Sequence, residues 1–168
     1  TKEGYVLSLL NISQVYSSLG MGYASKYYAL LALWSTWNFS DPSQYKRLHQ
    51  ALGLICFSDF SHGAWISAIS DFNLYLFVKR EFDERGFEID NDDIYQRTIF
   101  NISAIVHAVP LIHPEMSDLI ESLKSRWGFI WEEQIEPQLL QISKRIKNMD
   151  ELKRVLAVNL RDKPLNDV

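Results

Sequence analysis

Four histidines have the widest chemical use in this chain, because an imidazole can bind a metal ion or exchange a proton near neutral pH. They are His49, His62, His107 and His113. No two of them have the His-x-x-x-His spacing, and none follows a glutamate at the Glu-x-x-His spacing of helical metal sites. The densest acidic run, Asp90 with Asp92 and Asp93, favours a solvated helix start over a cation loop. The sequence therefore predicts no metal site and no cofactor.

Other reactive patterns are missing or have a simpler interpretation. None of the seven glycines has the spacing of a phosphate-binding loop, and there is no nucleophile elbow. The single cysteine, Cys56, lies in an apolar stretch, where an inert buried thiol is expected. The basic run at Lys144, Arg145 and Lys147 suits the last turn of a helix. A phosphate-binding face there remains an alternative.

Composition limits the class of protein. Of 168 residues, 47% are hydrophobic and 23% are charged, which is typical of a folded domain. The net charge of −4 argues against a surface built as a whole to bind nucleic acid. One cysteine excludes an internal disulfide, so we expect a reducing, cytoplasmic setting. No stretch is long and apolar enough to span a membrane, and we expect no membrane association.

Helical spacing of apolar residues runs along the whole chain and predicts an all-α antiparallel bundle of about seven to eight helices. The first helix covers about 3–19, and glycines at 20 and 22 follow it. The second, 23–37, is apolar almost all round, which is expected of a helix in the middle of a bundle. A third begins at Asp41-Pro42 and ends near 57, and a fourth, capped by Ser61, reaches about 82 before Gly86. We expect Tyr27, Leu31, Trp34, Leu52, Trp65, Ile69, Phe72, Ile102 and Val106 to be largely buried. An exposed Trp34 or Trp65 would instead mark a partner interface.

The C-terminal part follows the same period. A fifth helix ends near 108, Pro110 and Pro114 bracket a break, and Met116, Ile120, Leu123 and Trp127 form the next apolar stripe. Gly128 or Pro137 is expected to kink or divide the following region. A final helix, capped by Asp150, ends near 161. The prediction is one helical domain over 1–161 and a tail or linker over 162–168.

The segment Ala24–Leu33, with its Tyr-Tyr-Ala core, and the later segment Tyr45–Leu52 together resemble the second and third helices of the HEPN superfamily. The resemblance implies a helical bundle over about 1–108, with further helices over 114–161. It also implies dimerisation, and either metal-independent RNA cleavage or a binding and scaffolding role. Tyr28, Arg47 and His49 are the candidate binding residues.

Active members of that superfamily carry an arginine and, four to six residues later, a histidine on the last bundle helix. Here Arg97 and His107 are ten residues apart, about 15 Å along a helix, so both side chains cannot reach one phosphate. Arg47 and His49 point to different sides of their helix. Arg97, His107 and His49 are therefore candidate catalytic residues whose spacing departs from the family motif.

The leading hypothesis from the sequence is a non-catalytic helical interaction or sensing module. We expect it to be part of a larger prokaryotic protein, such as a defence or toxin–antitoxin component, and to act as a homo-oligomer or against a neighbouring domain. The first alternative is a ribonuclease of the HEPN type, with RNA as partner. The second is a helical bundle that binds a small ligand between its helices.

Overall fold

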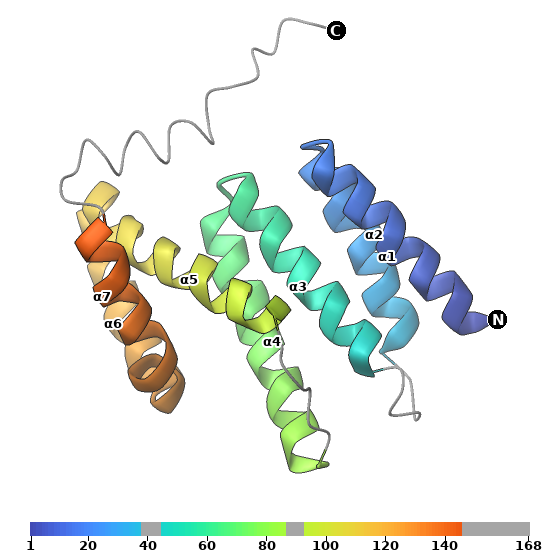
Figure 1. Ribbon diagram of the computed structural model, residues 1–168. Helices are drawn as coiled ribbons and strands as arrows, with labels where there is room; N and C mark the ends of the chain where they lie inside the picture. Colours follow the sequence, from blue (N-terminus) through green and yellow to red (C-terminus); the bar gives the residue numbers. More distant parts are fainter. Residues whose placement is uncertain (38–44, 87–92, 146–168) are drawn as a thin grey trace, which may run out of the picture. The chain divides into compact units, whose positions relative to one another are not determined.

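The computed structural model describes residues 1–37, 45–86 and 93–145, and in these residues the chain is all helical (Figure 1). The elements are α1 (Lys2–Ser18), α2 (Gly22–Thr36), α3 (Tyr45–Ser61), α4 (Trp65–Glu84), α5 (Asp93–Ile112), η2 (Pro114–Met116), α6 (Ser117–Trp127), η3 (Trp131–Ile135) and α7 (Glu136–Arg145). The described part contains seven α-helices and no strand, which confirms the predicted all-α helical bundle. The expected helix start at Asp41-Pro42, the acidic run at 90–92 and the final helix and tail beyond 150 lie outside the described residues.

The helices form two compact units, Thr1–Thr98 and the residues from Ile99 onward. The division falls inside α5, ten residues before the end of the bundle that the resemblance implies at about 108. Helices α1 to α4 and the start of α5 belong to the first unit. No helix in the described ranges has the length and hydropathy needed to cross a bilayer.

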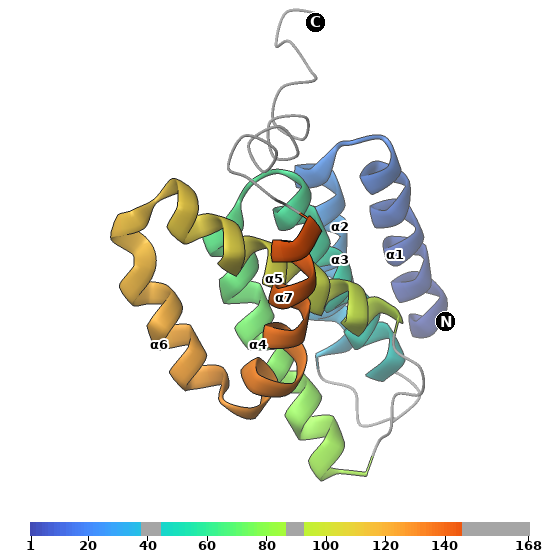
Figure 2. The same ribbon diagram turned by 60° about the vertical axis from the view of Figure 1, so that its left-hand side comes forward.

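In the first unit α2 lies between α1 and α3, and α3 in turn packs against α4 (Figures 1 and 2). The buried side of α1 is the predicted stripe of Val6, Leu9, Leu10 and Ser13. Larger side chains fill the space between α3 and α4, where Leu52, Phe72 and Tyr75 are fully buried. This packing determines which side of α2 faces neighbouring helices.

The turns between these helices depend on glycines in the left-handed region. Gly20 (φ 72°) follows α1 and Gly86 (φ 74°) follows α4, as the sequence predicts. The predicted cap of α4 is wrong. Ser61 is the last residue of α3, and its Oγ donates a hydrogen bond to the Phe57 carbonyl oxygen of its own helix. α4 begins at Trp65, after Gly63 (φ 71°), and its N-cap residue Ala64 makes no side-chain capping bond.

In the second unit, the predicted end of the fifth helix is wrong and the predicted apolar stripe of the next helix is confirmed. α5 continues through Pro110 to Ile112, where a break was expected. Pro110 has no N–H to donate to the carbonyl oxygen four residues earlier, and its ring crowds that carbonyl, so it weakens the last turn of α5, which ends two residues later. Ile120, Leu123 and Trp127 of α6 are buried, whereas Met116 is half-buried. Gly128 (φ 47°) ends α6, and Pro137 lies just after the π-helical turn η3, which runs directly into α7.

The predicted core is correct in most positions and wrong in two. Leu52, Ile69, Phe72, Ile102 and Val106 are buried, and Leu31 and Trp65 are half-buried. Tyr27 and Trp34, in contrast, are exposed. Both wrong positions are on α2.

Candidate interaction surface

A continuous row of large apolar side chains follows the outer side of α2. It consists of Tyr23, Tyr27, Leu30, Trp34 and Trp37, with exposed fractions of 81%, 58%, 43%, 80% and 47%. Their spacing of four, three, four and three residues places them on one face of the helix. We call this row the aromatic face of α2. It is opposite to the face that packs against α1 and α3.

Small residues explain why α2 turns its largest side chains outward. The buried residues of α2 are mostly small, with Leu33 as the one large side chain among Gly22, Ser25, Ala29, Ala32 and Thr36. Small side chains let α1 and α3 approach the α2 backbone closely, which leaves space for no large ring on that side. Because α2 is apolar almost all round, hydropathy alone predicts a helix buried in the middle of the bundle, and the row of small residues is the signal in the sequence that indicates an exposed side.

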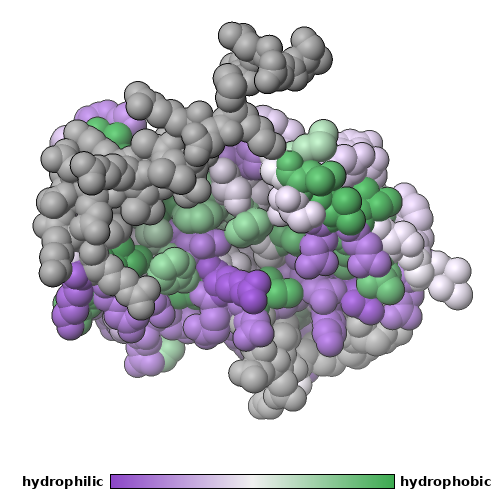
Figure 3. Space-filling view, turned by 45° about the horizontal axis from the view of Figure 1, so that its top comes forward, coloured by the Kyte–Doolittle hydropathy of each residue, from purple (hydrophilic) through white to green (hydrophobic). Residues whose placement is uncertain are grey.

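Further apolar residues are exposed at the end of the unit where α1 stops and α2 begins. Leu19 and Met21 in this turn are 57% and 50% exposed. Figure 3, in which the top of Figure 1 is turned forward, shows apolar surface (green) on the side where the N-terminal helices lie. Exposed apolar residues therefore also occur at the turn that precedes the aromatic face.

A charged cluster holds α2 against α3 and α4. The Lys26 ammonium lies 2.6 Å from Asp59 Oδ2 of α3 and 2.9 Å from Asp71 Oδ2 of α4, and it donates a hydrogen bond to Ser67 Oγ of α4 at 3.0 Å. Asp59 is buried, and Lys26 and Asp71 are about one-fifth exposed. Lys26 is also the only charged residue of α2. The cluster thus joins three helices through one cation.

The environment of the cluster changes how its groups titrate. Partial burial and the neighbouring Asp59 carboxyl raise the pKa of Asp71 to about 6, although Lys26 acts in the opposite direction. Burial alone would lower the pKa of Lys26, but its bonds to the two carboxylates outweigh that effect and raise it. Cys56 lies in the same region, and burial raises the pKa of its thiol, so it stays protonated and unreactive.

We expect the Asp71→Asn variant to be more stable than the wild type at pH 7, by about 1 to 3 kcal/mol once screening at a partly exposed carboxyl is allowed for. The folded state holds the Asp71 proton more tightly than the unfolded chain does. The stability from this group is therefore complete below about pH 4 and is lost as the pH rises towards 6. The asparagine amide resembles the protonated Asp71 carboxyl in shape and charge but does not titrate, so the variant keeps this stability at pH 7.

Urea unfolding at pH 7 and pH 5 measures this effect. The advantage of Asp71→Asn over the wild type should shrink between pH 7 and pH 5. Asp83→Asn, on the same helix with a 55% exposed side chain, serves as the control and should show no such change. A variant less stable than the wild type at pH 7 would show that the Lys26–Asp71 ion pair outweighs the burial of Asp71.

The His62 ring connects the end of α3 to the backbone at the start of α2. His62 Nδ1 lies 2.9 Å from the Ser58 carbonyl oxygen, and its Nε2 accepts a hydrogen bond from the Gly22 N–H at 3.0 Å. The Nδ1–H tautomer satisfies both contacts. A Cβ at position 22 would overlap the imidazole ring, so glycine is needed there for close approach. On the same part of α2, the buried Ser25 hydroxyl lies within hydrogen-bond distance of the hydroxyls of Ser13 (3.2 Å) and Ser58 (3.0 Å).

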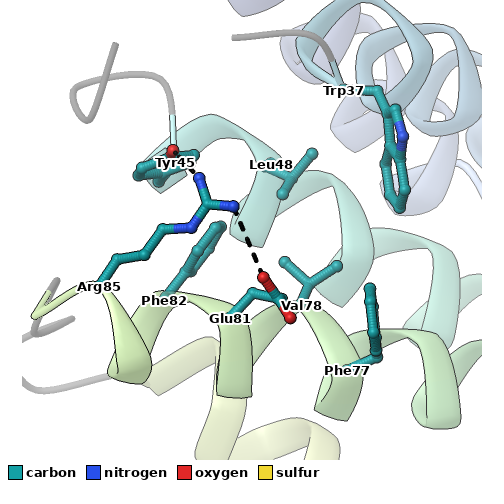
Figure 4. A pocket seen from close by; sticks show the side chains of 8 residues that line it. All are labelled: Trp37, Tyr45, Leu48, Phe77, Val78, Glu81, Phe82 and Arg85. Carbon is teal, nitrogen blue, oxygen red and sulfur yellow. Dashed lines mark hydrogen bonds and ion pairs between the residues drawn. The ribbon is translucent and has the colours of Figure 1, made fainter. Parts of the chain in front are cut away.

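A shallow pocket of about 260 Å³ lies near the C-terminal end of α2. Eight residues line it, as Figure 4 shows: Trp37, Tyr45, Leu48, Phe77, Val78, Glu81, Phe82 and Arg85. Arg85 lies 3.5 Å from Glu81 and donates a hydrogen bond to the Tyr45 hydroxyl at 3.2 Å. Trp37 belongs both to this pocket and to the aromatic face. The pocket therefore extends the apolar surface of α2 towards α4.

Three of the candidate site residues from the sequence lie on α2 and α3 of the first unit, where each contacts different neighbours. His49 is buried on α3, and its ring lies within hydrogen-bond distance of the Tyr75 hydroxyl at 2.8 Å, so it is a core residue rather than an accessible base. Arg47 lies beside Gln50 (3.1 Å) and Glu3 (3.9 Å). Tyr28 stacks on Tyr16 at 5.4 Å between centroids.

The other two candidates are on α5. Arg97 is exposed, and it belongs to the first compact unit. His107 is half-buried in the second unit, and burial lowers the pKa of its imidazole. A lowered pKa favours the neutral ring, which is the form of a packed histidine as well as of a base.

Among the described residues, no three His, Cys, Asp or Glu side chains stand close enough to hold a metal ion. The most distinctive features of the first unit are the aromatic face of α2 and the Lys26 cluster at one edge of it, and the sequence patterns predict neither. Comparison with family models, with curated proteins and with solved structures finds no match for this chain.

Proposed function

We propose that this chain is a non-catalytic helical interaction module that binds protein through the aromatic face of α2. The observation that carries the proposal is the 80% exposure of Trp34. Full burial of a large apolar side chain is worth about 1.5 to 3 kcal/mol, so a monomer that leaves such rings in water forgoes stability that a partner can supply.

The size and composition of the face support the same proposal. Four exposed aromatic rings and Leu30 present on the order of 600 Å² of mainly apolar surface, at the upper end of what a typical monomer exposes in one patch. Tryptophan and tyrosine are the residues most enriched among those that dominate binding energy in protein interfaces. A row of both on one helix is the pattern of an interface rather than of scattered surface residues.

The rest of the unit supports binding rather than catalysis. The Lys26 ammonium is neutralised by two carboxylates, and Cys56 and His49 are buried. Lys26 joins α2 to α3 and α4, and His49 joins α3 to α4 through the Tyr75 hydroxyl. Their role is to hold the helix so that its outer face is presented in a fixed orientation.

Photo-cross-linking in cells that produce the protein tests the proposal. With p-benzoylphenylalanine in place of Tyr27, we expect one discrete protein adduct, because the ring lies on the face that the partner covers. The same probe at Phe57 is the matched control, since this aromatic residue is 43% exposed on α3 but two residues from Asp59 and so on a different side of that helix.

The adduct at Tyr27 should disappear when Trp34→Glu is added, because a charge in the centre of an apolar interface is costly to bury. The absence of any protein adduct from Tyr27, or equal adducts from Tyr27 and Phe57, would rule out the aromatic face as a binding surface. Both outcomes are read on the same gel, with mass spectrometry of the excised band.

A further inference from the structure

We infer that the partner of the aromatic face is a second copy of this chain, and that two α2 helices pack antiparallel about a twofold axis at Leu30. This inference rests on the proposed function, since it names the partner of the same surface. Three properties of the face carry it: its spacing, its lack of charge and its area.

The spacing of the face is close to symmetric about its centre. An antiparallel pair with its axis beside Leu30 places Tyr23 of one copy opposite Trp37 of the other, and Tyr27 opposite Trp34. Each tyrosine then meets a tryptophan, and the two leucines meet at the axis. Such pairs suit offset or edge-to-face ring contacts. A face that complements itself in this way is what an isologous dimer requires.

The absence of free charge on α2 favours a second copy over a different partner. Complexes of unlike proteins commonly use complementary charges to select the partner. Within Gly22–Thr36 the single charged residue is Lys26, and its ammonium is already held by Asp59 and Asp71. Two copies can therefore approach along α2 without bringing like charges together.

The area of the face is also close to what a dimer needs. A standard interface buries about 800 Å² on each partner. The five residues of the face supply on the order of 600 Å², and the half-buried Ala24, Tyr28 and Leu31 along one edge add to it. No rearrangement of the unit is needed to reach an interface of ordinary size.

Sedimentation velocity on the purified full chain between 1 and 100 µM tests the inference. We expect a dimer whose dissociation constant rises about 100-fold or more in Trp34→Glu, because a central aromatic anchor is lost and a charge is introduced. Trp34→Phe should keep the dimer. Phe57→Glu places the same charge on α3 and should leave the dissociation constant unchanged.

Disulfide trapping tests the geometry. In a Cys56→Ala background, Leu30→Cys should form a disulfide-linked dimer on mild oxidation. Tyr23→Cys and Trp37→Cys should each fail to do so alone but form a mixed dimer when combined. A parallel arrangement would instead link each variant to itself, and that pattern overturns the inference.

Three other results would also overturn it. A chain that stays monomeric at 100 µM while Tyr27 still cross-links to a different protein would show a hetero-partner, and the proposed function would stand. A Tyr27 cross-link within one chain to residues 146–168 would show that the chain covers its own face. If Tyr27 gives no adduct and the chain is monomeric, both the proposed function and the dimer fail.

Discussion

We expect Phe72→Ala to lower the free energy of unfolding by about 3 to 5 kcal/mol. The Phe72 ring of α4 is fully buried, with 0% exposed surface, between helices that leave it in contact on all sides. Removing it costs the transfer free energy of the ring and also the cavity that close-packed neighbours cannot fill. Urea unfolding followed by circular dichroism measures the loss.

Phe77→Ala is the matched control, because Phe77 is on the same helix and is 47% exposed. Its loss should be less than half of that at Phe72, since much of its ring is already in water. Equal losses at the two positions would mean that α4 does not bury the face that the structure assigns to it.

Periodicity in the sequence was sufficient to predict Phe72 as core. Ile69 and Phe72 stand three residues apart and so lie on one side of α4, and the structure buries both. α2 is apolar on almost every side. Hydropathy cannot choose a face on a helix that is apolar almost all round, and the choice depends on which helices flank it.

The structure supplies this missing information. α1 and α3 lie against α2, and the small residues Ser25, Ala29 and Ala32 are the part of the sequence that fits them. From the sequence, an exposed ring at position 34 is expected to mark a partner interface, and Trp34 is 80% exposed. The pattern of small residues, more than that of apolar ones, identifies the packed face.

The Lys26 cluster could not be predicted from the sequence for a different reason. Its acidic partners are 33 and 45 residues away, on two other helices. Periodicity describes one helix at a time and contains no register between helices, so it cannot place Lys26 against Asp59 and Asp71. The one signal in the sequence is that Lys26 is the single charge in an otherwise uncharged helix.

The cluster and the aromatic face are connected through the backbone of α2. Lys26 is adjacent to Tyr27 and one turn before Leu30, so the side chain that ties α2 to α3 and α4 lies at the edge of the exposed row. A change in the cluster therefore acts on the helix that carries the proposed interface.

Lys26→Met tests this connection, and we expect it to lower the free energy of unfolding at pH 7 by about 3 to 5 kcal/mol. Methionine keeps the apolar length of the side chain but leaves the Asp59 and Asp71 carboxylates close together without a cation. Asp71 can relieve the repulsion by taking up a proton, so the loss should become smaller at pH 5.

The double variant Lys26→Met/Asp71→Asn should recover part of the loss at pH 7, because one of the two uncompensated carboxylates is gone. Arg80→Met is the control, since Arg80 makes a 3.8 Å ion pair with Glu84 of the same helix, both side chains are about two-thirds exposed, and the loss should cost less than about 1 kcal/mol. If Lys26→Met costs no more than Arg80→Met, the cluster does not hold α2 in place. In that case the orientation of the aromatic face rests on the packing of Ser25, Ala29 and Ala32 alone.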